Sequence, residues 1–227
     1  ARISVVWRLP QVMREFVVGF GELLEAAGAP RDTFDDRENR HPYPILGQLL
    51  LECEKRSNCD HVALLIGQHT GLADLGLAGQ LAFCAETAGA GLQNMIDHFN
   101  LSSSASTVSL LSAGNFSRFV YAISGHGVTS TRQLQLGGIV IAYNMLRELF
   151  GSRWQPTVIT VASRPPKNLR TVQQFFRAPL RFNSDESAVA FETRWLDQRL
   201  APVDPLLRSK VEAESRARRL AILSDLP

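Results

Sequence analysis

The sequence predicts an α+β domain in which helices pack on a mostly antiparallel sheet. Segments with apolar residues at helical spacing fill most of about the first 100 residues, and a hairpin pattern follows around Gly114-Asn115. Beyond this hairpin, strand-like and helical segments do not alternate regularly, which disfavours a parallel α/β sheet. A chain of 227 residues is long enough to bury a substantial core in a single domain.

The first predicted helix begins near Pro10 and ends near Ala27. Proline is favoured in the first turn of a helix, and the apolar residues between these positions recur at helical spacing. Gly28 and Pro30 are typical of a helix end. The charged segment 31–44 is bounded by prolines, and it is predicted to be a loop.

Three further helices are predicted before the hairpin. They cover residues 45–55, 61–69 with Asp60 as its N-cap, and 91–99. Between the last two, the segment 71–87 is rich in glycine, leucine and alanine. Its glycines suggest that backbone segments approach each other closely here and do not form one long helix.

The predicted hairpin has strands at 108–113 and 118–124. The longest predicted helix follows at 129–150, with Thr129 or Ser130 as its cap and a glycine after its end. Because this helix is apolar on most sides, we expect it to be the central buried helix of the domain.

Short strands and proline-containing turns are predicted after that helix. One strand begins after Trp154 and ends before Pro165-Pro166, and the aromatic pair Phe175-Phe176 then precedes an extended segment. We expect the aromatic pair to pack in the core under a loop. A further strand is predicted at 188–191, and a last helix begins at Pro205.

Composition and charge favour a globular protein of a reducing compartment. The formal net charge of +2 is too small to indicate a nucleic-acid or membrane surface by itself. The three cysteines form no CxxC pair, which favours a reducing cytoplasm over a disulfide framework. The sequence shows neither a signal peptide nor an apolar run long enough to span a bilayer. We therefore expect a cytoplasmic protein without a membrane partner.

No segment predicts a catalytic or cofactor site. Ser124-Gly125-His126-Gly127 lacks the G-x-S-x-G pattern of a nucleophile elbow and is more typical of a glycine turn. Cys84 lies in an apolar segment without a neighbouring cation, so we expect a core thiol. The histidines lack zinc-ligand spacing, and the glycine-rich segment lacks a phosphate-loop motif. We expect neither a metal nor a cofactor.

Polar residues in apolar surroundings are the candidates for a small-molecule site, because such sites combine an apolar cavity with a few polar groups. The candidate ligand-binding residues are His69, Arg118, Tyr121, His126, Arg132 and Tyr143, and Gln133 and Gln135 have the same setting. A polar residue in such a setting more often pairs with another buried group or faces water than binds a ligand. The arginines and tyrosines among them suit either an anionic or an amphipathic ligand.

Two long stretches place characteristic motifs in a fixed order. The first is GLADLGLAGQLAFCAETAGAGLQNMIDHFNL; the second is LGGIVIAYNMLRELFGSRWQPTVITVASRPP, followed by FFRAPLRFNSDESAVAFETRWLDQRLAPVDPLL. Together they resemble the arabinose-binding-type N-terminal domain of AraC-type bacterial transcriptional regulators, over about residues 11–215. Two loops depart from that family's pattern: Ser163-Arg164-Pro165 stands where the family has His-Pro, and Arg177-Ala178 where it has glycine.

The resemblance implies a domain that senses a small molecule and passes its occupancy to a DNA-binding domain, often through dimerisation. It implies no catalytic activity. Residues 1–205 would form the effector-binding and dimerisation domain, and residues 206–227 would begin a linker helix to a helix-turn-helix domain that is absent from these residues. The expected partners are then a small-molecule effector, a second copy of the chain, and DNA only through the C-terminal domain.

Two other functions stay open from the sequence. One is a small hydrolase or transferase that uses Ser124 with His126, or Cys84, and generic serine or cysteine probes would detect it. The other is a dimerisation module without a ligand, which predicts a core without a cavity.

Overall fold

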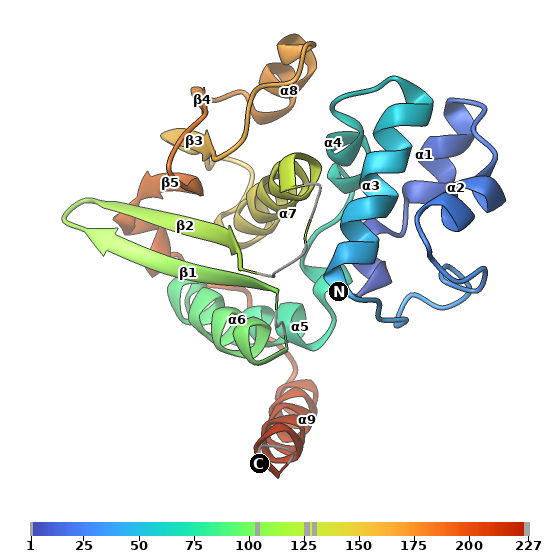
Figure 1. Cartoon of the computed structure of the whole chain (residues 1–227). Coiled ribbons are helices and arrows are strands. Elements are labelled where there is room, and N and C mark those ends of the chain that lie inside the picture. Colours follow the sequence, from blue (N-terminus) through green and yellow to red (C-terminus); the bar gives the residue numbers. More distant parts are fainter. Residues whose placement is uncertain (1, 103–104, 125–127, 129–130, 225–227) are drawn as a thin grey trace.

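Helices pack on one face of a five-stranded sheet in the computed structural model, which describes residues 2–102, 105–124, 128 and 131–224 (Figure 1). The strand order is β1-β2-β5-β3-β4, and each neighbouring pair is antiparallel except β3 and β4. The strands are β1 (Ser106–Ala113), β2 (Phe116–Ile123), β3 (Val158–Val161), β4 (Leu180–Phe182) and β5 (Ser187–Glu192). The predicted α+β fold with a mostly antiparallel sheet is confirmed.

Helices precede, connect and follow these strands. They are α1 (Leu9–Glu15), α2 (Phe20–Ala26), α3 (Tyr43–Ser57), α4 (Val62–Gly67), α5 (Leu77–Phe83), α6 (Ala88–Ser102), α7 (Thr131–Phe150), α8 (Leu169–Phe176) and α9 (Pro205–Ser224). Short 3-10 helices are η1 (Ile3–Val6), η2 (Leu72–Leu75) and η3 (Thr193–Asp197). The helices predicted at 45–55, 91–99 and 129–150 are confirmed, although the predicted caps Thr129 and Ser130 lie outside the described residues.

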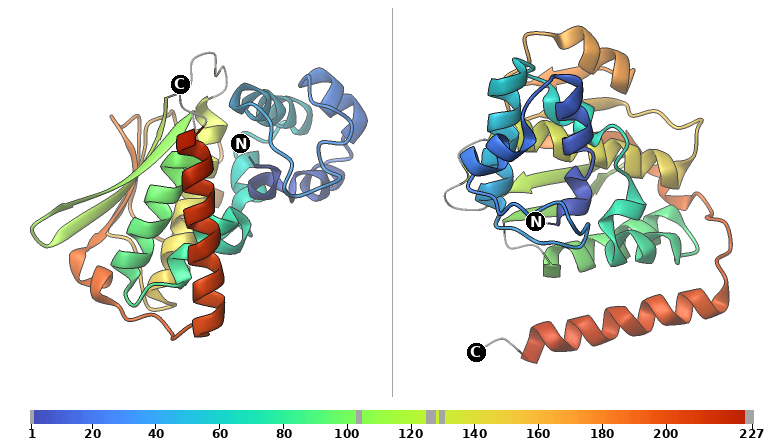
Figure 2. Two further views of the ribbon diagram at one scale, coloured as in Figure 1. Left: turned by 90° about the horizontal axis from the view of Figure 1, so that it is seen from below. Right: turned by 90° about the vertical axis from the view of Figure 1, so that its right-hand side faces the viewer.

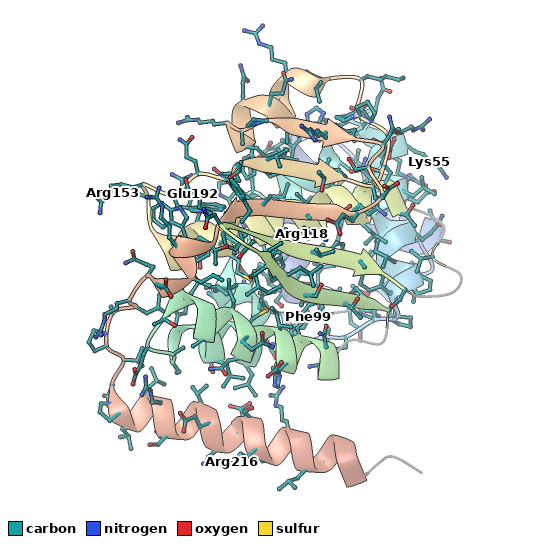
Figure 3. The ribbon with its side chains drawn as sticks, turned by 90° about the vertical axis from the view of Figure 1, so that its left-hand side faces the viewer. Lys55, Phe99, Arg118, Arg153, Glu192 and Arg216 are labelled. Carbon is teal, nitrogen blue, oxygen red and sulfur yellow. The ribbon has the colours of Figure 1, made fainter. Side chains whose placement is uncertain are left out.

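β1 and β2 form the predicted hairpin, and all eight residues of each strand are paired. Gly114 turns the chain with a φ of +58°, a conformation that glycine adopts easily. Alternation along β2 places Phe119 and Tyr121 on the face that the helices cover, and it places Arg118 on the opposite, uncovered face (Figure 3). β2 therefore presents its buried side chains to α7, and β1 lies next to α6.

The prediction of one continuous helix over 10–27 is wrong, because the chain breaks between α1 and α2. Val17 has a φ of +57°, and the backbone N–H of Val18 donates to the carbonyl of Met13 at 3.2 Å. A straight helix of this length would extend about 27 Å, at about 1.5 Å per residue, and take its second half away from the core. The turn instead lets Met13 of α1 and Leu23 of α2, both fully buried, pack in one cluster.

Replacing Val17 by glycine is expected to raise the free energy of unfolding by about 0.5–1 kcal/mol. A non-glycine residue in the left-handed region costs about 1–2 kcal/mol, and the greater freedom of glycine in the unfolded chain offsets part of that gain. The Val17 side chain is 93% exposed, so its removal loses almost no packing. Urea unfolding measures the change. Val17→Ala keeps a Cβ at this position and is the control; an equal gain from both variants would contradict backbone strain as the cause.

Two apolar clusters form the core, and α7 contributes to both. The larger cluster lies between the sheet and helices α6 and α7, and it includes Phe119 and Phe191. The smaller cluster fills the N-terminal helical lobe, which we define as η1 and α1–α4 (Figure 1). Leu134 of α7 belongs to the lobe cluster, whereas Ile139 and later residues of α7 belong to the sheet cluster. The predicted central buried helix is confirmed.

The glycine-rich segment after α4 forms the two short elements η2 and α5. A Cβ on Gly79 would lie 1.8 Å from the carbonyl oxygen of Leu72, and a Cβ on Gly91 would lie 2.3 Å from the carbonyl oxygen of Ala82. Any larger residue would displace backbone atoms at both positions. Glycine therefore allows η2 to pack on α5 and α5 to pack on α6, and the predicted close approach is confirmed.

The predicted N-cap role of Asp60 is wrong, because α4 begins at Val62 after His61 and no side chain caps it. The Asp60 carboxylate instead accepts a hydrogen bond from the backbone N–H of Lys167 and lies 3.4 Å from Nδ1 of His61. Burial acts to raise the pKa of Asp60, but the contacts with Lys167 and His61 outweigh it and lower the pKa. Asp60 thereby connects the start of α4 to the segment before α8.

An aromatic cluster connects α7, β5 and α8. Trp154 is 2% exposed, and its ring centroid lies 5.5 Å from that of Phe150 and 6.4 Å from that of Phe191. Phe176 is fully buried and packs edge-on against Tyr143 at 5.3 Å between ring centroids. The predicted core packing is confirmed for Phe176, whereas Phe175 is only partly buried, and both residues belong to α8 and not to a segment under a loop.

The residue after this aromatic pair keeps a backbone conformation that glycine favours. Arg177 ends α8 with a φ of +51°, and its N–H donates to the carbonyl of Gln173 at 2.9 Å. A left-handed residue at this position is the usual way to end a helix. Arg177 therefore has a conformation that glycine would adopt at less cost.

α9 lies across the underside of the molecule, next to α5 and α6 (Figure 2). Val211 is 3% exposed and packs against Leu77 and Leu81 of α5. Most of the remaining α9 surface faces solvent, including Leu206 and Leu220. Within the described part of the chain, no helix combines the length and apolar character needed to cross a bilayer.

Candidate functional site

A cavity of about 300 Å³ lies between the N-terminal helical lobe, α7 and the covered face of the sheet. This volume is at the lower end of the range for small-molecule sites. The apolar lining includes Val6, Leu46, Leu50 and Ile66 of the lobe, Met95 and Phe99 of α6, Val108 and Phe119 of the hairpin, and Leu134, Ile141 and Met145 of α7. The structure therefore does not have the cavity-free core that a ligand-free dimerisation module predicts.

Two adjacent glycines in α7 create space for this cavity. Gly137 and Gly138 line it together with Ile141, one turn later on the helix. A Cβ on Gly138 would lie 2.4 Å from the ring of Tyr121, so this ring packs directly on the helix backbone. A Cβ on Gly137 would make only ordinary contact with Ala63, at 3.5 Å. Gly138 thus allows β2 to lie close to α7, and Gly137 leaves space for the cavity beside α7.

A pair of tyrosines joins the lobe to the sheet at the cavity. Tyr43, the first residue of α3, and Tyr121 of β2 form a hydrogen bond through their hydroxyl groups. Each hydroxyl also forms a hydrogen bond with Ser106. Burial raises the pKa of both phenols, and that of Tyr121 rises well above its ordinary value. Both phenols are therefore neutral at physiological pH and can donate or accept a hydrogen bond.

The charged side chains of the cavity lining are arginines. Arg2 and Arg40 line the cavity, His41 and His98 are its other basic residues, and the described lining contains no Asp or Glu. An antiparallel backbone bridge joins Arg2 to Arg40, which places the two residues side by side. Nη1 of Arg2 lies 2.9 Å from Oε2 of Glu38. Burial is the main cause that lowers the pKa of Arg2, and the positive charge of Arg40 adds to it.

Of the residues predicted to bind a ligand, Tyr121 lines this cavity. Tyr143 lies in the aromatic cluster instead, with its ring centroid 5.7 Å from that of Trp154. Arg118 lies on the uncovered face of the sheet, where its Nε is 2.8 Å from Oε1 of Glu186 (Figure 3). The structure therefore does not bring these three candidates together.

Arg132 and Gln133 hold α7 against the lobe. Arg132 forms an ion pair with Glu54 of α3 and donates to the carbonyl of Asp60 at 2.6 Å. Gln133 is fully buried, donates to Glu54 at 2.8 Å and accepts from the backbone N–H of Ala63 at 3.1 Å. Partners within the protein satisfy both side chains, as is usual for buried polar groups.

The other candidates lie away from the cavity or outside the described residues. His69 is exposed and borders a second, open hollow together with Asn144 and Glu148. Gln135 lines neither the cavity nor this hollow. His126 lies outside the described residues.

Several lining residues were missed by reasoning from the sequence. The polar and charged ones are Arg2, Arg40, His41, Tyr43, His98 and Ser106. They belong to segments without a common periodicity, and the packing of the lobe against the hairpin brings them together. A sequence signal that could point to this space is the glycine pair inside the otherwise apolar helix α7.

The candidate nucleophile Cys84 lacks a suitable setting, and the described residues do not include the partner suggested for Ser124. Cys84 is 7% exposed and packs beneath α9, and burial raises its pKa, which disfavours the reactive thiolate. The backbone N–H of Ser124 donates to the carbonyl of Ala105 at 2.9 Å, while the suggested partner His126 is not described. No three metal-ligating side chains come together in the part of the chain that the structure describes.

Comparisons with known proteins agree with this architecture. The sequence model for the arabinose-binding domain of AraC transcription regulators, N-terminal, matches residues 18–200. The crystal structure of the transcriptional regulator CdpR from Pseudomonas aeruginosa is similar with a TM-score of 0.59, over 95% of this chain and 71% of that chain, at 15% sequence identity. At this identity the similarity shows a shared fold. A comparison with curated proteins gives no match.

Proposed function

Because the chain belongs to the family of arabinose-binding N-terminal domains of AraC transcription regulators, we propose that it binds a small-molecule effector in the cavity between its lobe and its sheet. In this proposal, residues 1–205 form the effector-binding part. Residues 206–227, which include most of α9, connect it to the DNA-binding part of the regulator. No catalytic step belongs to the proposal.

The cavity is the observation that supports effector binding most directly. Its walls come from both apolar clusters, and the hydrogen bond between Tyr43 and Tyr121 crosses from one wall to the other. A ligand in this space would contact the lobe and the sheet at the same time. The ligand would therefore favour one arrangement of the lobe and the sheet over any other. A ligand shifts a conformational equilibrium only when it binds one arrangement more tightly than the others.

Helix α5 connects the cavity with α9. Ala78 of α5 lines the cavity, whereas Leu77 and Leu81 of the same helix pack against Val211 of α9. The close approach at Gly79 holds α5 against η2 without spare space. A displacement of α5 on its cavity side is therefore expected to move its α9 side as well, because tightly packed elements transmit strain.

Arg2 provides a second connection between the cavity and α9. It lines the cavity, and its pKa also responds to the charges of Glu214 and Arg218 on α9. These two residues form an ion pair with each other at 2.8 Å. A ligand that changes the environment of Arg2 would therefore change the electrostatic environment of α9.

A thermal-shift screen of metabolites, amino acids and fatty acids tests the proposal. A ligand at about 100 times its Kd should stabilise the domain by about 2.7 kcal/mol. Ala105→Phe adds a ring at a half-buried residue of the cavity lining and should abolish this stabilisation. Ala113→Phe makes the same change at the exposed far end of β1 and should leave it intact. Stabilisation that survives Ala105→Phe, or a screen without any hit, would contradict binding in this cavity.

Hydrogen exchange tests the connection to α9. Ligand binding should slow amide exchange in α9 around Val211, because a filled cavity restricts α5 and thereby the contact between α5 and α9. Slower exchange in α7 with no change in α9 would show that a ligand binds without affecting the helix that we propose as the connection.

A further inference from the structure

We infer that the effector is a small amphipathic anion, with one carboxylate or similar group held by Arg2 and Arg40 and an apolar body in the cavity. This inference rests on the proposed function, because it names the chemical class of the ligand of the same cavity. Three observations support it: the unbalanced positive charge of the lining, the apolar character of the walls, and the volume.

The positive charge at Arg2 and Arg40 is only partly balanced. Among the described residues, the carboxylate within ion-pair distance of this pair is Glu38, whose side chain is 62% exposed. Glu214 of α9 also acts on Arg2, but it is accompanied by the positive charge of Arg218. Within the described residues, Arg40 forms no ion pair, and no acidic side chain lines the cavity. A cationic ligand would therefore meet like charge without a compensating carboxylate, whereas an anion would meet two guanidinium groups.

The position of the two arginines suits a carboxylate. The backbone bridge between Arg2 and Arg40 places these residues side by side, so their guanidinium groups can approach one anionic group together. The Arg2 side chain is only 13% exposed, which shields it from solvent and strengthens a charge-assisted hydrogen bond. The exposed Arg40 side chain can reorient to complete the contact.

The remaining lining suits an apolar body and disfavours a sugar. The hydroxyl groups of Tyr43, Tyr121 and Ser106 already bond to one another, and most other lining side chains are aliphatic or aromatic. A polyhydroxyl ligand would leave most of its hydroxyl groups without hydrogen-bond partners, which is costly. A volume of about 300 Å³ corresponds to the liquid volume of about ten water molecules, and hence to a ligand of about ten non-hydrogen atoms.

Octanoate and octanamide form a matched pair of probes for this inference. They have the same number of non-hydrogen atoms and the same tail, and they differ in charge. Isothermal titration calorimetry should show that octanoate binds at least about tenfold more tightly than octanamide. Arg40→Gln should weaken octanoate binding about tenfold and leave octanamide binding unchanged. Arg118→Gln, on the uncovered face of the sheet, is the matched control. It should change neither octanoate binding nor octanamide binding. Unchanged thermal unfolding of each variant would show that its fold is intact.

The outcomes separate this inference from the proposed function. Equal binding of the two probes, or octanoate binding that Arg40→Gln does not weaken, would overturn the anionic class. If neither probe binds while other ligands bind and are lost in Ala105→Phe, the anionic class is also wrong and effector binding in the cavity stands. If octanoate binding survives Ala105→Phe, both the inference and the assignment of this cavity are wrong.

Discussion

Gly79→Ala is expected to lower the free energy of unfolding by about 3 kcal/mol, at the upper end of the usual cost of overpacking. The added Cβ would lie 1.8 Å from the carbonyl oxygen of Leu72. This oxygen belongs to the backbone, so no side-chain rotation relieves the clash, and η2 or α5 must move. Alanine favours a helix over glycine by only about 1 kcal/mol, which offsets part of the cost. Because Leu75 and Ala78 line the cavity, ligand binding should weaken in the same variant.

Urea unfolding followed by circular dichroism measures this effect, since the midpoint and slope together give the free energy of unfolding. Gly21→Ala in α2 is the matched control, because an added Cβ there has no atom within 4 Å. We expect this control to stabilise the protein by up to about 1 kcal/mol. If Gly79→Ala were as stable as the unchanged protein, η2 and α5 would not pack as described.

Trp154→Ala should be still more costly, at about 3–5 kcal/mol of unfolding free energy. Trp154 is 2% exposed, and three rings surround it: Tyr143 and Phe150 of α7 and Phe191 of β5. Removing the indole would leave a void among side chains that belong to separate elements and cannot easily close it. The variant would also weaken the contact between α7 and β5, and both of these elements support the larger apolar cluster.

Two further variants show whether packing is the cause. The indole Nε1 of Trp154 is buried and has no hydrogen-bond partner among the described residues, so Trp154→Phe loses no hydrogen bond. We expect it to cost only about 1 kcal/mol, because an aromatic ring remains. Phe116→Ala, at a residue that is 54% exposed, should change stability by less than about 0.5 kcal/mol. Thermal unfolding compares the three variants, and equal losses for Trp154→Phe and Trp154→Ala would contradict the packing explanation.

Elements that local patterns define could be predicted from the sequence. The Gly114-Asn115 turn between two strand-like runs predicted the hairpin, because turn and strand preferences depend on residues close in the chain. The segment that became α7 is apolar on most sides, and it predicted a central helix because such a helix is stable when most of its surface is buried. The order of such motifs also predicted the family, which the match over residues 18–200 confirms.

The predictions that the structure contradicts failed for a different physical reason. The helical spacing of residues 10–27 continues through the break at Val17, and the packing of α1 and α2 into one cluster decides the break. Asp60 has the chemistry of an N-cap, but a contact with the distant residue Lys167 uses its carboxylate. Arg132 had been a ligand candidate, and it pairs with Glu54, far away in the sequence. In each case a long-range contact outweighs a local preference.

The sequence by itself determined the hairpin, the central helix, the α+β class and the family of this protein, because each depends on periodicity, turn chemistry and the order of motifs along the chain. Only the tertiary structure decided where a ligand could bind. Arg2, Tyr43, Ser106, Tyr121 and Gly138 line one cavity although the chain separates most of them widely. Their proximity results from packing the helical lobe against the hairpin around α7, and no pattern within a single segment encodes a space that several segments enclose.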